Sequence, residues 1–392
     1  MDSLENVYKH LRNHFKTKFG LTEFDDFSID LEQLNSLSND IYHVIYKRKK
    51  TGEIIYELCY RNFGEIGELV NRELETFIIK SLSDKGLGPK IIESDNNTYR
   101  LDEYINNSQN LPHEILKTEK ILNKIIKLFI NYNSILPIYK YKITDNNEYK
   151  VKYEIYNYNN NINNNFNNIQ NIIDLCIKKM YQKGLKALEN FKINLKNNNN
   201  NDITINKKLE SINNFAINIK QIFFSNFPEQ FFFLLNHNDT LRENFLLKED
   251  NIYIIDHEYG SLNLPGFDIT NYLVESNFDY SRDINFIPEE INLDLYFEIF
   301  LKYINELEKT ENINEFKRTI EGKNFFNEIK TINYFLKLTI LDNILWFIFA
   351  LIYFNYEKFT KNLGFNYFQH AYDRTLYYDK ILEYKRNYEN NK

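Results

Sequence analysis

Apolar residues recur along the chain with two different periods, one typical of helices and the other typical of strands. Near the N-terminus, large apolar residues occur at every fourth position, namely Val7, Leu11, Phe15 and Phe19. This spacing predicts a helix that ends at Gly20. Residues 41–46 and 54–60 are rich in Ile and Tyr and flank a basic turn at 47–52, so they predict a pair of strands with a solvent-exposed hairpin tip.

The remainder of the chain is predicted to be mostly helical. Residues 111–135 carry an apolar stripe at helical spacing, and three later segments are also predicted as helices: 172–191, 205–224 and 293–307. Two Asn-rich segments, about 155–171 and 194–202, cannot bury enough apolar area to become ordered, so we expect loops there. The most apolar run, 344–354, is too short to span a bilayer and predicts a buried helix, with no transmembrane segment.

Composition narrows the class of protein. With 392 residues, of which 43% are hydrophobic, the chain is long enough for a large core divided between two lobes. A formal net charge of -7 argues against general nucleic-acid binding, because the phosphate backbone requires a basic face.

The two cysteines, Cys59 and Cys176, lie far apart and predict neither a disulfide framework nor a zinc site. The first residues lack the basic and then apolar order of a secretory signal, so we expect a cytoplasmic protein.

Polar side chains that could carry out chemistry follow two predicted strands. The apolar run 231–235 leads to Asp239 and, five residues later, to Asn244. A turn then precedes a second predicted strand, whose end carries Asp256 and Glu258. Because side chains alternate along a strand, Asp256 and Glu258 can point the same way. The sequence therefore predicts that three carboxylates and one carboxamide converge.

This set of groups fits phosphoryl transfer. That reaction needs a carboxylate to orient and deprotonate a hydroxyl, and oxygen ligands to hold magnesium on the phosphates. The order Asp239, Asn244 and Asp256 is the kinase order of base, amide ligand and carboxylate ligand. Each residue alone would more often cap a turn or end a strand, as Asn and Asp commonly do. The residues together, at this spacing, favour a phosphotransferase.

The sequence resembles the choline/ethanolamine kinases, which have a protein-kinase-like fold. The stretches that carry the resemblance are His237-Asn238-Asp239 with Asn244, Ile255-Asp256-His257-Glu258-Tyr259, and Gly266-Phe267-Asp268-Ile269 with Asn271 and Glu275. The family usually has Phe at the position of His257 and Trp at the position of Ser276. The resemblance covers about residues 35–380. It implies an α+β, bilobal fold, with a small antiparallel-sheet lobe at 1–105 and a large, mostly helical lobe at 106–392.

The resemblance also implies nucleotide-binding residues. Ser38 and Asn39 match the loop that covers the phosphates, although the glycines that usually let this loop approach them are absent here. Arg61 matches the arginine that points toward the phosphates, and Glu75 matches its helix partner. The hinge that meets adenine through its backbone is implied at three residues: Glu103, Tyr104 and Ile105.

The amino-alcohol pocket is implied later in the chain. Four residues fall at helical offsets and share one face: Asp342, Trp346, Phe349 and Tyr353. Alone, such an aromatic stripe is more typical of a plain core. By resemblance, Trp346 is the first of two tryptophans around the substrate ammonium, and Phe349 replaces the second. Tyr280 forms a further wall, His370 stands where the family has Tyr, and Glu275 can accept a hydrogen bond from an ammonium.

The resemblance implies that the protein phosphorylates the hydroxyl of ethanolamine or choline with ATP and magnesium, the first step of phosphatidylethanolamine or phosphatidylcholine synthesis. Asp239 would contact the substrate and accept its hydroxyl proton, while Arg61 would support the phosphates. Magnesium would be held by three residues: Asn244, Asp256 and, for a second ion, Glu258. Ethanolamine is slightly favoured, because the thinned aromatic cage weakens the recognition of a quaternary ammonium.

Two alternative functions stay open. An aminoglycoside-phosphotransferase-like kinase of the same fold also uses an Asp-x4-Asn pair and a strand-end Asp, although residues 342–371 speak against it. A non-catalytic nucleotide-binding scaffold is suggested by the missing loop glycines and by His257, whereas the intact Asp239, Asn244 and Asp256 weigh against it. A homodimer is one possible assembly.

Overall fold

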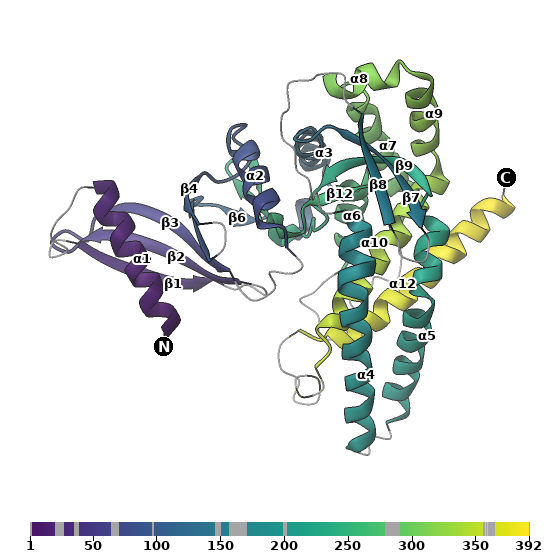
Figure 1. Ribbon diagram of the computed structural model, residues 1–392, viewed down its shortest axis with the longest axis horizontal. Helices are drawn as coiled ribbons and strands as arrows, with labels where there is room; N and C mark the ends of the chain where they lie inside the picture. Colours follow the sequence, from purple (N-terminus) through teal and green to yellow (C-terminus); the bar gives the residue numbers. More distant parts are fainter. Residues whose placement is uncertain are drawn as a thin grey trace. The chain divides into compact units, whose positions relative to one another are not determined.

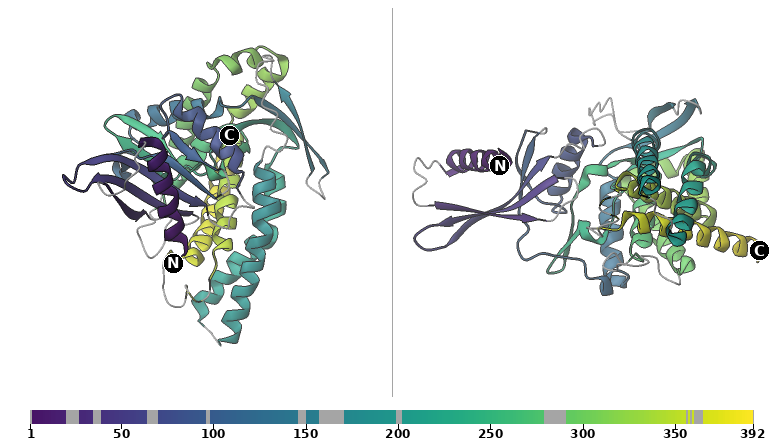
Figure 2. Two further views of the ribbon diagram at one scale, coloured as in Figure 1. Left: turned by 60° about the vertical axis from the view of Figure 1, so that its left-hand side comes forward. Right: turned by 90° about the horizontal axis from the view of Figure 1, so that it is seen from below.

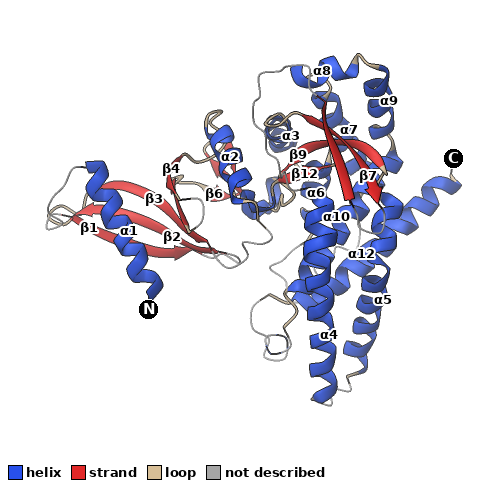
Figure 3. Cartoon of the chain, viewed as in Figure 1, coloured by secondary structure: helices blue, strands red, loops and turns tan. Residues whose placement is uncertain are grey.

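The protein folds into two compact units. The computed structural model describes residues 2–19, 27–34, 39–63, 70–95, 98–145, 150–156, 171–198, 202–278, 291–355, 357, 359 and 365–391. The first unit contains Met1–Gln109 and Leu246–Glu258, and the second contains Asn110–Phe245 and Tyr259–Lys392. Residues 246–258, which the sequence-based division at residue 105 assigned to the second lobe, thus pack with the first unit. Most strands of the first unit form one sheet, whereas helices dominate the second unit (Figure 3).

The first unit is built on a five-stranded antiparallel sheet of order β1-β2-β3-β5-β4. Its strands are β1 (Phe27–Leu34), β2 (Asn39–Arg48), β3 (Ile54–Phe63), β4 (Ile91–Ser94) and β5 (Tyr99–Glu103). The predicted strand pair at 41–46 and 54–60 is confirmed by β2 and β3. Helix α1 (Asp2–Phe19) lies across one face of the sheet (Figure 1).

The core of this unit lies between α1 and the sheet. It is formed by three residues of α1 and six of the strands: Val7, Leu11, Phe15, Tyr42, Val44, Tyr46, Leu58, Tyr60 and Leu101. Three of the four positions that predicted a helix at the N-terminus therefore provide its buried face. Because strand residues alternate in direction, His43, Cys59 and Arg61 belong to the opposite face of the sheet.

Two further pieces complete the first unit. Helix α2 (Arg72–Ser83) is capped at its N-terminus by Asn71. The Asn71 side chain accepts a hydrogen bond from the backbone N–H of Leu74 at 3.1 Å. A second sheet of order β11-β10-β6 contains β6 (Gln109–Asn110), β10 (Phe245–Lys248) and β11 (Asn251–Ile254). The N–H of Ile254 donates to the carbonyl of Leu87 at 3.2 Å, which ties β11 to the turn after α2.

The second unit contains a four-stranded sheet of order β12-β9-β7-β8. Its strands are β7 (Ile138–Asp145), β8 (Lys150–Tyr156), β9 (Gln230–Asn236) and β12 (Ser261–Asn263). The predicted apolar strand 231–235 is confirmed as the buried part of β9. The strand is followed directly by His237, which is buried in the interior of the unit. The last residue of the strand, Asn236, pairs with Ser261 of β12.

The second unit is mostly helical, and several of its helices pack on one apolar helix, α10. Its longer helices are η4 (Ile173–Met180), which is a π-helix, and α3 (Glu119–Asn133), α4 (Tyr181–Asn197), α5 (Ile203–Asn226), α6 (Phe267–Glu275), α7 (Leu293–Leu307), α8 (Glu311–Lys317), α9 (Ile320–Ile329), α10 (Ile332–Ile352) and α12 (Tyr367–Asn390). Helices α4, α5, α6 and α12 all pack on α10, and α4 and α5 run side by side (Figure 2). By length and composition α10 could cross a membrane, but 83% of its most apolar window is buried inside the protein.

Most predicted helices of this unit are confirmed, with two corrections at the Asn-rich segments. Helix α4 continues to Asn197, into the segment predicted as a loop at 194–202, because Leu195 still packs into the core. Strand β8 likewise extends to Tyr156, into the segment predicted at 155–171. The rest of those two segments, apart from Asn171, Asn198 and Asp202, lies outside the described residues.

Candidate functional site

The loop that follows β9 is held by the side chain of Asp268, from α6. The two carboxylate oxygens of Asp268 accept hydrogen bonds from the backbone N–H groups of His237 at 2.8 Å and Asn238 at 2.9 Å. Burial raises the pKa of Asp268 to about 7, and the two backbone N–H groups oppose that rise. Gly266, which precedes α6, has φ +85°, and an added Cβ there would lie 2.4 Å from Cε2 of Phe300. Only glycine therefore fits at the turn that starts α6.

Asn238 is locked in the left-handed conformation. Its φ is 66°, a region that Asn tolerates better than most residues. The side-chain amide donates to the carbonyl of Tyr259 at 2.9 Å and to Oγ of Ser261 at 2.8 Å. Its oxygen accepts a hydrogen bond from Asn263 Nδ2 at 2.8 Å. These contacts fix the backbone one residue before Asp239.

Asp239 is held from its other side by Thr240 and Asn244. Asn271 Oδ1 accepts from both the backbone N–H and the hydroxyl of Thr240, each at 2.6 Å. Nδ2 of Asn244 donates to the carbonyl of Asp239 at 2.9 Å. Asp239 is 7% exposed and Asn244 is 8% exposed, so the predicted base and the predicted amide ligand lie in one rigid, mostly buried loop.

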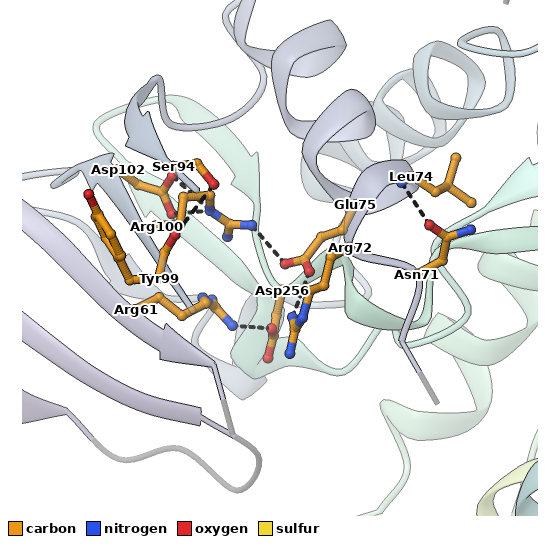
Figure 4. Close-up of polar contacts among 10 residues, drawn as sticks. All are labelled: Arg61, Asn71, Arg72, Leu74, Glu75, Ser94, Tyr99, Arg100, Asp102 and Asp256. Atoms are coloured by element: carbon orange, nitrogen blue, oxygen red, sulfur yellow. Dashed lines mark hydrogen bonds and ion pairs between the residues drawn. The ribbon is translucent and has the colours of Figure 1, made fainter. Parts of the chain in front are cut away.

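The first unit contains a cluster of arginines and carboxylates, which we call the arginine cluster (Figure 4). Its members are Arg61, Arg72, Glu75, Arg100, Asp102 and Asp256. Nη1 of Arg61 lies 2.8 Å from Oδ1 of Asp256. Glu75 accepts instead from Arg72 at 2.7 Å and from Arg100 at 2.9 Å. The expected direct pair of Arg61 with Glu75 is thus replaced by two other pairs.

The replacement follows from sheet register. Arg61 of β3 and Arg100 of β5 are direct cross-strand partners, so two guanidinium groups reach the same region and only one bonds to Glu75. Burial by itself would raise the pKa of Glu75, but Arg100, Arg61 and Arg72 overcome that effect and lower it to about 2. Arg61 therefore stays in electrostatic contact with Glu75 although it bonds to Asp256.

The implied hinge residues make local contacts. The N–H of Glu103 donates to the carbonyl of Lys90 at 2.8 Å, and the carbonyl of Tyr104 accepts from the N–H of Asn106 at 3.1 Å. The ring of Tyr104 stacks on His43, with centroids 3.7 Å apart. Ile105 follows, and its carbonyl accepts from Ser108 at 3.3 Å.

The structure describes only part of the implied phosphate loop. Ser38 lies outside the described residues. Asn39 begins β2, where its backbone pairs with Phe63.

The predicted magnesium ligands belong to both units. Asn244 lies in the second unit, while Asp256 and Glu258 lie in the first. Asp256 has φ 63° and a side chain that is 26% exposed, and Glu258 is buried. Among the residues that the structure describes, no three His, Cys, Asp or Glu side chains gather closely enough to bind a metal by themselves. Carboxylate and amide oxygens are nonetheless the donors that magnesium prefers.

The residues implied for the amino-alcohol pocket lie in the second unit. Trp346 and Phe349 contact each other edge to face, with centroids 5.2 Å apart. Phe349 also contacts Tyr259 at 6.2 Å and Tyr353 at 4.8 Å. Tyr353 in turn stacks on Tyr367 at 5.0 Å, so a tyrosine to which the sequence gave no role, Tyr367, joins this aromatic group. Tyr280 lies outside the described residues.

The charged part of this region combines Glu275, Asp342 and Arg374, which we call the carboxylate cluster. Nη2 of Arg374 donates to Oε1 of Glu275 at 2.6 Å, and both side chains are fully buried. His370, one turn before Arg374 on α12, is also buried. Burial and the nearby Arg374 lower the pKa of His370 well below its ordinary value, so its imidazole is neutral. Arg374 and Asp342 received no role from the sequence, and their helical offsets from His370 and Trp346 were the only available signal.

The chain is similar to known proteins in sequence and in fold. Residues 31–379 match the family model described as choline/ethanolamine kinase. A probable ethanolamine kinase of Arabidopsis thaliana is 45% identical over 56 residues, which span 14% of this chain and 15% of that relative. A choline kinase of Cryptosporidium parvum has 15% identity and a TM-score of 0.63, covering 99% of this chain and 97% of the other. An ethanolamine kinase of Plasmodium vivax has 17% identity and a TM-score of 0.53, covering 94% and 87%.

Proposed function

Because the chain belongs to the choline/ethanolamine kinase family, we propose that it transfers the γ-phosphoryl group of ATP to the hydroxyl of a small amino alcohol, with ethanolamine slightly favoured over choline. The observation that carries the proposal is the construction of the loop around Asp239. Asp268, Asn271 and Asn244 hold the backbone on both sides of this carboxylate. Such rigidity suits a group that has to meet a substrate hydroxyl in one orientation.

In the proposed reaction, Asp239 accepts the proton of the substrate hydroxyl as that oxygen attacks the γ-phosphorus. The bond between the γ-phosphorus and the bridging oxygen of ADP breaks, and the phosphomonoester and ADP leave. The Asp239 carboxylate orients the hydroxyl before transfer and holds its proton afterwards.

Asn244, Asp256 and Glu258 are the residues that would hold magnesium on the phosphates. Bound magnesium would neutralise the charge that develops on the phosphate oxygens. Arg61 would support the phosphates with its guanidinium, which suits oxyanions. Since Nη1 of Arg61 bonds to Asp256 at 2.8 Å, we expect Arg61 to exchange this carboxylate for a phosphate oxygen when the nucleotide binds.

The preference for ethanolamine rests on the aromatic cage. Trp provides the strongest attraction for a quaternary ammonium, and this chain has one tryptophan, Trp346, with Phe349 at the neighbouring position. The neutral His370 stands where the family has a tyrosine. If the cage sets the preference, Phe349→Trp raises the kcat/KM for choline relative to ethanolamine. An unchanged ratio would mean that the cage does not set it.

The reaction is tested by the steady-state kinetics of Asp239→Asn. General-base catalysis typically contributes about 10²–10⁴-fold, so we expect a loss of that size in kcat with the affinity for ATP retained. Glu243→Gln is the matched control, because Glu243 is an exposed carboxylate in the same loop and pairs only with its exposed neighbour Arg242 in the described structure. Near-normal turnover by Asp239→Asn would contradict the assignment of Asp239 as the base.

A further inference from the structure

Among the residues that the structure describes, the carboxylate cluster contains more carboxylates than cations. Glu275 extends from α6 and Asp342 from α10, and both lie within electrostatic reach of a single guanidinium, that of Arg374 on α12. Arg374 donates to Glu275, whereas Asp342 accepts from the neutral amide of Asn271 at 2.8 Å. All three charged side chains are buried. A buried negative charge without a cation is costly, so this cluster is suited to receive a positively charged group.

Two buried polar atoms in the cluster point to a ligand that donates hydrogen bonds. Oδ2 of Asp342 and the hydroxyl of Tyr377 have no hydrogen-bond partner among the residues that the structure describes. Both side chains are fully buried. Burial raises the pKa of Tyr377, and Asp342 and, more weakly, Glu275 raise it further, so its hydroxyl lies within electrostatic reach of both. Unsatisfied oxygens in such dry surroundings cost free energy that an N–H donor would recover.

Asp342 is also next to the ring that the resemblance assigns to the substrate ammonium. Burial and Glu275 raise the pKa of the Asp342 carboxyl well above its ordinary value. Trp346 lies one turn farther along α10, and its indole N–H is near enough to lower that pKa as a hydrogen-bond donor. The carboxyl of Asp342 and the indole that the resemblance assigns to the substrate ammonium are therefore neighbours.

We propose that Asp342 is a specificity-determining residue, which accepts an N–H hydrogen bond from the substrate ammonium and so selects a primary ammonium over a quaternary one. This inference rests on the proposed function. A primary ammonium has three N–H donors, whereas choline has none. The aromatic face attracts both kinds of cation, so the carboxylate oxygen is the group that distinguishes them.

A purely structural role for Asp342 predicts a different pattern. Through Asn271, Asp342 is linked to Thr240, which follows Asp239 in the loop after β9. Loss of this link would displace the loop and reduce transfer to every acceptor by the same factor. Direct recognition of N–H groups instead predicts an effect that depends on the acceptor.

The wild-type protein provides the first test, since it needs no substitution. Transfer is measured with ethanolamine, N-methylethanolamine, N,N-dimethylethanolamine and choline, which differ in the number of N–H donors. A hydrogen bond to a charged group is typically worth about tenfold or more in affinity, so we expect kcat/KM to fall by at least about tenfold along the series. Equal values for the four acceptors, or values that rise with methylation, would overturn the proposal.

The second test is Asp342→Asn, which keeps the shape and presents an amide to the ammonium. We expect KM for ethanolamine to rise about tenfold, while KM for choline changes by less than about twofold. Asp294→Asn, the same change at an exposed position of α7, is the control and leaves both values unaltered.

The outcomes separate this inference from the proposed function. Equal losses for ethanolamine and choline in Asp342→Asn would overturn the role of Asp342 and leave the kinase intact. Absence of transfer to all four acceptors by the wild-type protein would overturn the proposed function itself, and this inference with it.

Discussion

Each unit contains a buried group of charged side chains, and the two groups differ in their balance of charge. The arginine cluster of the first unit has as many guanidinium groups as carboxylates: Arg61, Arg72 and Arg100 with Glu75, Asp102 and Asp256. In the carboxylate cluster of the second unit, Glu275 and Asp342 share Arg374. The pKa of Glu75 is consequently lowered to about 2, whereas that of Asp342 is raised well above its ordinary value.

This difference shows what burial does to a carboxylate in the presence and in the absence of enough cations. Burial favours the protonated form in both places. Bonded guanidinium groups reverse that preference at Glu75, which therefore acts as a permanent anion between Arg72 and Arg100. Asp342 has one amide partner and a second oxygen with none in the described structure, so its charge depends on what binds there.

The largest expected effect comes from Glu75→Gln. The change leaves Arg100, which is 2% exposed, without the carboxylate that its Nη1 contacts. Breaking a buried ion pair by removing one partner typically costs about 3–5 kcal/mol, and we expect a loss of this size in the free energy of unfolding in urea. Glu73→Gln, at an exposed position of the same helix turn, is the control and should cost less than about 0.5 kcal/mol. Equal stabilities of the two variants would contradict the balanced cluster.

The lowered pKa of Glu75 also predicts how the free energy of unfolding depends on pH. Because the pKa of Glu75 is lower in the folded protein than in the unfolded chain, its contribution is present above pH 4.5 and is lost as the pH falls toward 2. The shift corresponds to about 3 kcal/mol over that interval. Urea unfolding at a series of pH values should show a shallower decline for Glu75→Gln than for the wild-type protein. Parallel curves would show that Glu75 is not the group responsible.

Asn271→Ala removes the neutral amide that donates a hydrogen bond to Asp342, a carboxylate that has no cation of its own bonded to it in the described structure. The change leaves the N–H of Thr240 and Oδ1 of Asp342 without their partner, while the Thr240 hydroxyl keeps its hydrogen bond to the carbonyl of Asp268 at 3.0 Å. We expect a loss of about 1–3 kcal/mol in the free energy of unfolding. Asn218→Ala removes an exposed amide on α5 and is the matched control. A loss no larger than that of the control would mean that Asn271 does not support the loop.

The smallest effect on stability is expected for Asp342→Asn. Comparing this variant with Glu75→Gln contrasts the two clusters most directly. The change is chemically the same as Glu75→Gln, but it removes a charge that burial disfavours, and the amide oxygen can still accept from Asn271. We expect the free energy of unfolding at neutral pH to change by less than about 1 kcal/mol, or to increase. A loss as large as that of Glu75→Gln would show that charge balance does not distinguish the two clusters.

Sequence patterns predicted the elements that carry the site better than the contacts between them. The apolar run of β9 and the helical offsets of α10 depend on local periodicity, which is readable in the chain. The partner of Glu75 depends on which residue of β5 faces Arg61 across the sheet, and only the register decides that. The bond between Asn271 and Asp342 joins residues 71 positions apart and requires α6 to pack on α10.

Some assignments remain predictions. The roles of Ser38 and Tyr280 fall on positions outside the described residues. The magnesium ligands are likewise expected from the order of Asp239, Asn244 and Asp256 and from the donor chemistry, since these residues are divided between two units. The helical offset of Arg374 from His370 was too weak a signal to reveal its role, because a charged residue on a helix is usually exposed, and this one is fully buried.

The most direct test of the account is the fate of the γ-phosphate in a mixture of protein, ATP, magnesium and ethanolamine, followed by phosphorus NMR. We predict that the γ-phosphate signal is replaced by that of a phosphomonoester, and that Asp239→Asn forms this product at least about a hundredfold more slowly. Appearance of inorganic phosphate alone, or persistence of ATP with ethanolamine and with choline, would contradict the assignment of this protein as an amino-alcohol kinase.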